Sequence, residues 1–339
     1  MITSPVATKD EPLPQARVDA IPLVLLAAIA LAAFFLIGSA STWVTLTVAG
    51  LAMGLLIFIM ASGLTLVFGL MDVMNFAHGL FIAIGAYIAA STMKLFSAAA
   101  GSESFLANLG ALAPTLLAAL AVAGLIGLFF ERVIIQPVYG QHLKQILITT
   151  GGMIVAEQLI HVIWGPDLLP LPRPAALRGS FLIGDIAIEK YRLVAVVIGL
   201  AVFAAMMLIL NRTKVGLLIR AGVENKEMVE AMGYRIRRLF VAVFVAGSAL
   251  AGLGGALWGM YQENVTVHIG AQMMVLIFIV IIIGGLGSVG GCFVGALLVG
   301  LVANYVGYLS PKVALGSNIL LMMLILFWRP QGLYPVNKQ

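Results

Sequence analysis

Ten apolar stretches, each about 20 residues long, limit this chain of 339 residues to folds that cross a lipid bilayer. The stretches cover residues 21–38, 43–62, 76–94, 112–130, 146–164, 193–210, 239–260, 270–287, 291–309 and 313–328. Only 10% of the residues are charged and 62% are hydrophobic, which no soluble core of this size could hide. We therefore expect an all-α, polytopic membrane bundle of about ten transmembrane helices. The segment "GGLGSVGG" (284–291) divides the eighth and ninth stretches unevenly, so eight or nine helices remain possible.

Positive charge in the loop 211–238 determines the predicted orientation. Seven of the nineteen Lys and Arg residues lie in this loop, and the positive-inside rule places such loops in the cytoplasm. Counting spans from there puts both termini in the cytoplasm and the loop 165–192 outside. That external loop carries four basic residues of its own, which counts mildly against the assignment. Residues 1–20 and 331–339 are then cytoplasmic tails, the first of them disordered, around a transmembrane domain of residues 21–330.

Polar groups interrupt the apolar sequence in "GLTLVFGLMDVMNFAHGL", residues 63–80. The apolar run before them, residues 43–71, is too long for one untilted crossing, and Gly63 and Gly69 permit a break within it. Irregular backbone survives at membrane depth only where protein or a water-lined path surrounds it. A broken helix here would offer free backbone groups to a polar solute.

Two interpretations of this stretch remain open. In the first, the interruption lies beside a substrate path, with polar side chains directed into the bundle. The residues assigned to that path are Asp72, Asn75, Phe76, His78 and Gly79. In the second, the stretch is a cytoplasmic connector in which Asn75 caps the following helix.

A short amphipathic helix is predicted within "AGVENKEMVEAMGYRIRRLF", residues 221–240. Asn225 suits its N-cap, Glu227 its first turn and Gly233 its C-terminal end. A methionine-rich edge can insert in a groove on a partner protein, and three nearby acids make the alternative, a helix lying on anionic lipid, less favourable. The residues predicted to contact the partner are Glu227, Met228, Ala231, Met232 and Gly233.

Glycines of the C-terminal half have the spacing of close helix contacts. We assign to helix packing Gly255, Gly259, Gly284, Gly285, Gly287, Gly291 and Gly295. Tight packing explains this pattern without any ligand.

Motifs for catalysis or metal binding do not occur. The chain has no HExxH, no Cys/His metal spacing, no P-loop and no nucleophile elbow, so we assign no catalytic residue and no metal site. The net charge of +5 comes without a basic-aromatic pattern, so nucleic acid is not expected as a partner. Glu157 is the only clear acid in the middle of a span, which argues against an ion-coupled secondary transporter, the main rival along with a channel.

Three stretches, in the order in which they occur, are similar to the sequences of one known family. "NFAHG" (75–79) after "GLTLVFGLMDVM", "VEAMGYRIRR" with "FVAGSALAGLGGALWG" (244–259), and "VIIIGGLGSVGGCFVGALLVG" (280–300) resemble the permease subunits of branched-chain amino acid ABC importers, the LivH type. The resemblance runs from about residue 43 to residue 333.

The resemblance implies a multi-pass protein of the bacterial inner membrane that forms a path for branched-chain amino acids. It also implies a LivM-type permease, two ATPase subunits and a periplasmic solute-binding protein as partners, besides membrane lipid. The chain itself would bind no cofactor, since the ATPase subunits use the ATP. Residues 221–238 are similar to the loop that docks into those ATPase subunits. Related permeases carry urea, short amides or other small solutes, and these remain alternatives.

Overall fold

The computed structural model describes residues 20–334, so residues 1–19 and 335–339 of the two predicted tails lie outside the described residues. Helices dominate the fold. They are α1 Ile21–Ile37, α2 Ala40–Met71, α3 His78–Leu95, α4 Ser97–Ala100, α5 Phe105–Phe130, α6 His142–Trp164, α7 Lys190–Arg212, α8 Lys214–Glu224, α9 Lys226–Ala231, α10 Ile236–Gln262, α11 Ile269–Gly284, α12 Val289–Leu309 and α13 Ala314–Trp328. Three single turns, Glu131–Ile135, Gln136–Val138 and Ala175–Leu177, complete the helical part.

All ten apolar stretches of the sequence coincide with helices, which confirms the predicted polytopic all-α class. Seven helices within residues 20–334 are long and apolar enough to cross a membrane. The shorter apolar helices are Ile21–Ile37, Ile269–Gly284 and Gly316–Trp328. The boundary between the eighth and ninth stretches lies within the glycine-rich segment 284–291, as predicted. Helix α11 ends at Gly284 and α12 begins at Val289.

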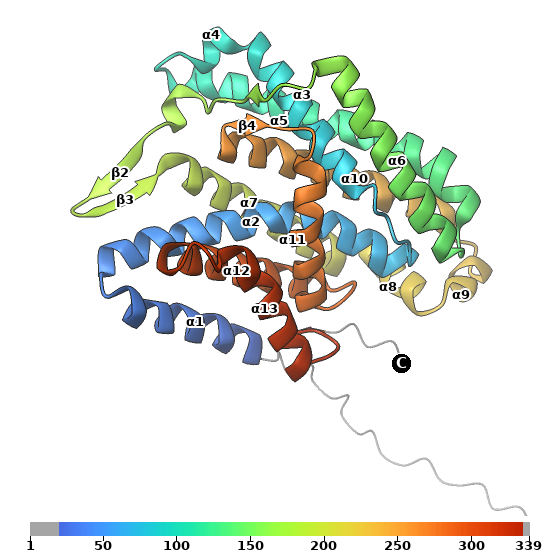
Figure 1. The fold of residues 1–339 in the computed structure, drawn as a ribbon. Coiled ribbons are helices and arrows are strands. Elements are labelled where there is room, and N and C mark those ends of the chain that lie inside the picture. The colour runs from blue at the N-terminus through green and yellow to red at the C-terminus, as the bar shows by residue number, and fades with distance from the viewer. Residues whose placement is uncertain (1–19, 335–339) are drawn as a thin grey trace, which may run out of the picture.

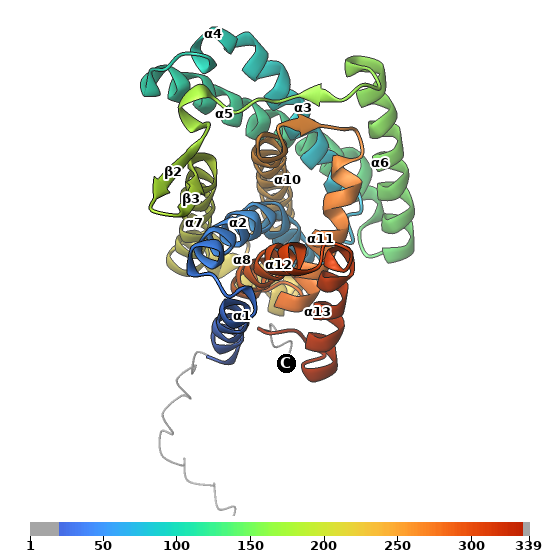
Figure 2. The same ribbon diagram turned by 60° about the vertical axis from the view of Figure 1, so that its left-hand side comes forward.

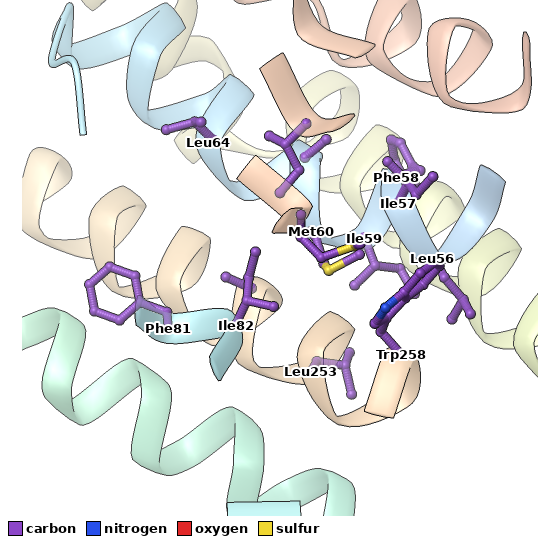
Figure 3. Packing of buried hydrophobic residues seen from close by; sticks show 14 of the residues in the cluster. Leu56, Ile57, Phe58, Ile59, Met60, Leu64, Phe81, Ile82, Leu253 and Trp258 are labelled. Atoms are coloured by element: carbon purple, nitrogen blue, oxygen red, sulfur yellow. The ribbon is translucent and has the colours of Figure 1, made fainter. Parts of the chain in front are cut away.

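The 32-residue helix α2 lies at the centre of the bundle. It packs against α12, α10, α7 and α11, and a second layer forms where α10 meets α3 and α5 (Figures 1 and 2). The core between these layers is apolar, and its buried residues include Met60 of α2, Ile82 of α3 and Leu253 of α10 (Figure 3). Because lipid is as apolar as these side chains, van der Waals packing and close backbone approach hold the helices together.

The two ends of the bundle differ. The strands β2 Ser180–Ile183 and β3 Ile186–Glu189 form an antiparallel hairpin that projects from one end, which we call the hairpin end. Helices α8 and α9 lie at the opposite end, which we call the α9 end (Figure 1). The long loop 165–192 is therefore an ordered structure in its own right.

An ion-pair cluster fixes that loop to the turn after α10. The strand β1 Leu169–Pro170 pairs with β4 Asn264–Val265. The Arg173 guanidinium donates to the carbonyl oxygens of Met260 and Tyr261 at 3.0 and 2.7 Å. It also lies 3.0 Å from a carboxylate oxygen of Glu189 and 3.2 Å from one of Glu263. One partly buried arginine thus joins three segments at the hairpin end.

Glycines assigned to packing lie where backbones meet. A Cβ at Gly255 would lie 2.0 Å from the carbonyl oxygen of Ile82 in α3, and one at Gly291 would lie 2.0 Å from that of Gly284. A Cβ at Gly295 would lie 2.8 Å from the carbonyl oxygen of Val280, and at Gly259 the nearest atom is a Leu171 methyl at 2.9 Å. Backbone atoms therefore exclude a side chain at Gly255, Gly291 and Gly295, whereas at Gly259 the nearest atoms belong to side chains.

Two of the seven glycines have a different role. Gly285 and Gly287 lie in the turn between α11 and α12, with φ of +98° and +80°. Residues with a Cβ rarely adopt such angles, so the turn conformation also requires glycine at these two positions.

Candidate functional site

The polar stretch predicted to be a helix interruption does interrupt the helix, but not at its glycines. Helix α2 continues without a break through Gly63 and Gly69 and ends at Met71. Asp72 then adopts a left-handed conformation with φ of +53°, and α3 begins only at His78. The expected break at the two glycines is wrong, because both are contact positions. A Cβ at Gly63 would lie 2.3 Å from the carbonyl oxygen of Gly247, and one at Gly69 would lie 2.8 Å from the Cα of Gly287.

The connector of residues 72–77 turns back into the bundle. At its start, the Asp72 carboxylate lies 3.9 Å from Nε2 of His142, the first residue of α6. Four residues later, the Phe76 N–H donates to Oγ1 of Thr149 at 3.2 Å, which is about 10 Å further along α6 at 1.5 Å per residue. The connector therefore runs inward beside α6.

Helix α3 consequently begins deep inside the bundle. The Nε2 atom of His78 lies 2.9 Å from the carbonyl oxygen of Met60. Met60 precedes the end of α2 by eleven residues, or about 16 Å of helix. The structure thus places non-helical backbone between three helices at a depth where lipid could not satisfy it.

The residues assigned to the substrate path have different surroundings. Asn75 and His78 are buried, at 2% and 1% exposure. The Asn75 side-chain oxygen accepts from the Ala77 N–H at 3.1 Å, whereas its Nδ2 has no hydrogen-bond partner within residues 20–334. The connector interpretation predicted that Asn75 caps α3. The N-cap of α3 is Ala77, two residues later, so that prediction is also wrong.

Asp72, Phe76 and Gly79 occupy three other positions. Asp72 does not point into the bundle, since half of its side chain is exposed beside His142 at the α9 end. Phe76 is 36% exposed, and its ring centroid lies 5.3 Å from that of Phe278. Gly79 faces no open passage, because a Cβ there would lie 2.8 Å from the carbonyl oxygen of Gly270 in α11.

The predicted docking helix is α9. The Asn225 side chain accepts from the Met228 N–H at 2.9 Å, which confirms the N-cap, and Gly233 has the left-handed φ of +85° expected after the helix. Met228 and Met232 are 59% and 58% exposed, whereas Val229 is buried against the bundle. Val229 therefore anchors α9 to the bundle, whereas Met228 and the C-cap residue Met232, about 100° and 60° around the helix axis from it, are exposed. Glu227, Ala231 and Gly233 are also exposed there.

A basic cavity of about 710 Å³ lies beside α9. Its lining residues are Arg132, Gln136, Glu230, Gly233, Tyr234, Arg235, Ile236, Arg237, Arg238 and Val241. Sequence reasoning missed Arg132 and Gln136, because they precede the docking loop by about a hundred residues and no local pattern links them to it. The α9 end thus combines exposed methionines with concentrated positive charge.

Glu131 is buried behind this cavity. The Tyr139 hydroxyl donates to a carboxylate oxygen of Glu131 at 2.5 Å. Burial, together with the bond to Glu131, raises the pKa of the Tyr139 phenol far above its ordinary value, so the phenol keeps its proton and remains a donor. This pair fixes the turn that follows α5 to the segment that precedes α6.

Within residues 20–334 no group of three or more His, Cys, Asp or Glu side chains could hold a metal ion. The single cysteine, Cys292, is buried.

Comparisons with known proteins give one consistent result. Residues 46–328 match the family described as the permease component of the branched-chain amino acid transport system. The chain is 29% identical over 294 residues to the permease BraD of a high-affinity branched-chain amino acid transport system of Pseudomonas aeruginosa, covering 84% of this chain and 93% of that protein. It is 25% identical to LivH of Salmonella typhimurium, covering 84% and 92%.

The second permease type of such systems also matches. LivM of Escherichia coli K12 is 25% identical over 295 residues, which cover 83% of this chain and 68% of that protein. No solved structure matches the chain.

Proposed function

Because this chain belongs to the family of branched-chain amino acid transport permeases, we propose that it forms the transmembrane path for leucine, isoleucine and valine in an ABC importer. The match of residues 46–328 to that family carries the proposal. The structure supports it with buried polar backbone on the connector 72–77 and with a docking surface on α9.

We further propose the partners and the location of the complex. A second permease of the LivM type would complete the membrane domain, since proteins of that type match this chain. Two ATPase subunits would dock at the α9 end and use ATP, and a periplasmic binding protein would deliver the solute at the hairpin end. The chain itself would bind no cofactor. The complex would lie in the bacterial inner membrane, with both chain termini in the cytoplasm.

Uptake by the purified importer tests the proposed function. Proteoliposomes that contain the permease pair, the ATPase subunits and the binding protein should accumulate labelled leucine, isoleucine and valine when ATP is present at the ATPase side. Urea and short amides serve as the alternative solutes. Uptake of these alone, or leucine uptake that does not depend on ATP, would overturn the proposal.

The orientation predicts a labelling pattern in intact spheroplasts. A cysteine at Ser180 on the projecting hairpin should react with a membrane-impermeant maleimide, whereas one at Glu227 on α9 should react only after the membrane is opened. The background is Cys292→Ala, since the native thiol is buried. Labelling of position 227 in intact cells would invert the topology.

The unpartnered amide of Asn75 makes a third prediction. Asn75→Ser keeps an acceptor for the Ala77 N–H, as serine does in similar turns, but removes Nδ2. If Nδ2 binds solute in the path, leucine transport per folded complex should fall by roughly tenfold, the value of a hydrogen bond of about 1.4 kcal/mol. Asn75→Ala, which also removes the acceptor, should in addition lower the yield of folded protein. Normal turnover per folded complex in both variants would leave the stretch as a structural connector.

A further inference from the structure

One flank of α6 carries polar residues that do not face the bundle. Gln145, Thr149, Met153 and Ile160 are the buried residues of α6 and define its inner face. Glu157 and His161, one helical turn apart, share the neighbouring flank and are only partly buried. Val155 lies on the opposite side of the helix and is 60% exposed. Helix α6 therefore has a polar flank and an apolar flank.

Helix α11 lies beside the polar flank. The rings of His161 and His268 are in contact, with centroids 6.3 Å apart. The methyl group of Met153 lies 3.1 Å from where a Cβ on Gly270 would be. His268, the N-cap residue of α11, and Gln272 in its first turn are both exposed. The polar groups of two separate helices thus lie on one surface.

Half-exposed aromatic rings continue this surface toward the α9 end. Phe76 of the connector packs against Phe278 of α11, with ring centroids 5.3 Å apart. We call the combined surface the α6–α11 face. Its residues are Phe76, Glu157, His161, His268, Gln272 and Phe278. Its polar and ionisable groups lie in the part nearer the hairpin end, the outer part. Its aromatic groups lie in the part nearer the α9 end, the inner part.

Lipid cannot cover the polar part of this face. Glu157 precedes the end of α6 by seven residues, which is about 10 Å inside the helix. Ionisable side chains at such depth face other protein or a water-filled cavity, because hydrocarbon leaves their charge without solvation. Within residues 20–334 no ion pair includes Glu157, so water or another protein solvates this carboxylate in the membrane.

We propose that the α6–α11 face is one wall of a path that this chain shares with the second permease subunit, and that the Glu157 carboxylate binds the ammonium group of the passing amino acid. This rests on the proposed function. The occupant of the opposite wall is a permease of the same family, since the LivM-type relatives match 83% of this chain. The outer polar groups match the charged end of the solute, and the Phe76 and Phe278 rings match its branched side chain.

A matched pair of cysteines on α6 tests the location of the path. Glu157 and Val155 lie at nearly the same depth, but two residues turn the helix by about 200°. In a Cys292→Ala background, the complete importer is treated with a charged, water-soluble methanethiosulfonate reagent. Position 157 should be modified and position 155 should not. Equal labelling of both, or labelling of neither, would overturn the shared path. His161→Cys, on the same flank as Glu157, repeats the test if Glu157→Cys does not assemble.

Uptake by Glu157→Gln tests the role of the carboxylate. This variant should lower leucine uptake by roughly tenfold or more, the effect of losing one charge-assisted hydrogen bond, while the ATPase subunits remain bound. Val155→Gln adds the same amide on the other flank and should leave uptake per assembled complex unchanged. Normal uptake by Glu157→Gln would overturn the ammonium site. A wild-type importer that does not carry leucine would overturn the proposed function instead, so the two failures are distinguishable.

Discussion

Gly255→Ala is expected to leave little folded permease in the membrane. The added methyl group would lie 2.0 Å from the carbonyl oxygen of Ile82, so α10 and α3 would have to separate. The obstacle is backbone inside a helix and not the end of a flexible side chain, so the neighbourhood cannot relax cheaply. We expect a destabilisation of at least about 3 kcal/mol, the upper part of the range for overpacked cores. The yield of monodisperse protein in detergent and its thermal unfolding measure the effect.

Gly307→Ala is the matched control for this substitution. Gly307 lies within α12, and nothing lies within 4 Å of a Cβ built there. Alanine has the higher helix propensity, so this variant should be as stable as the wild type or gain up to about 1 kcal/mol. A Gly255→Ala protein with the stability of Gly307→Ala would contradict the close approach of α3 and α10.

The helices could be predicted because the bilayer imposes a length on each apolar run. All ten runs are helical, and the capping residues of α9 are those that its sequence indicates, with Asn225 at the start and Gly233 after the end. Such signals are local, so neighbouring residues alone specify them. The glycines were harder to interpret, because a glycine that breaks a helix and one that lets another helix approach are identical in sequence.

Gly63 and Gly69 illustrate that ambiguity. Each faces a glycine more than 180 residues away in the sequence, Gly247 and Gly287, so only the tertiary structure shows why they occur. The same limit applies to the candidate site. The polar cluster of residues 72–78 could be found as an anomaly within an apolar chain, but the inward course of the connector depends on Thr149 and Met60, which belong to other parts of the fold.

Met228→Glu is expected to uncouple the permease from the proposed ATPase subunits. Met228 is 59% exposed on α9, and the neighbouring residue Val229 is buried and anchors that helix to the bundle. A carboxylate inserted into an apolar groove of the partner would lose its water shell, at a cost of roughly 2–4 kcal/mol. Since 1.4 kcal/mol corresponds to a factor of ten, docking should weaken by roughly 30-fold to 1,000-fold. Co-purification of the ATPase subunits and solute-stimulated ATP hydrolysis measure the loss.

Two control variants distinguish a loss of docking from a loss of folding and from a general effect of added charge. Gln141→Glu adds a carboxylate to an exposed residue of the connector that precedes α6, at the same end of the bundle but outside α9, and should leave the ATPase subunits bound. Met228→Leu retains an apolar side chain of similar size and should preserve coupling. Because the Asn225 cap uses the backbone N–H of residue 228, neither substitution there removes a hydrogen bond from α9. Stimulated hydrolysis at the wild-type rate in Met228→Glu would therefore refute the docking role of α9 itself, since the helix would still be folded.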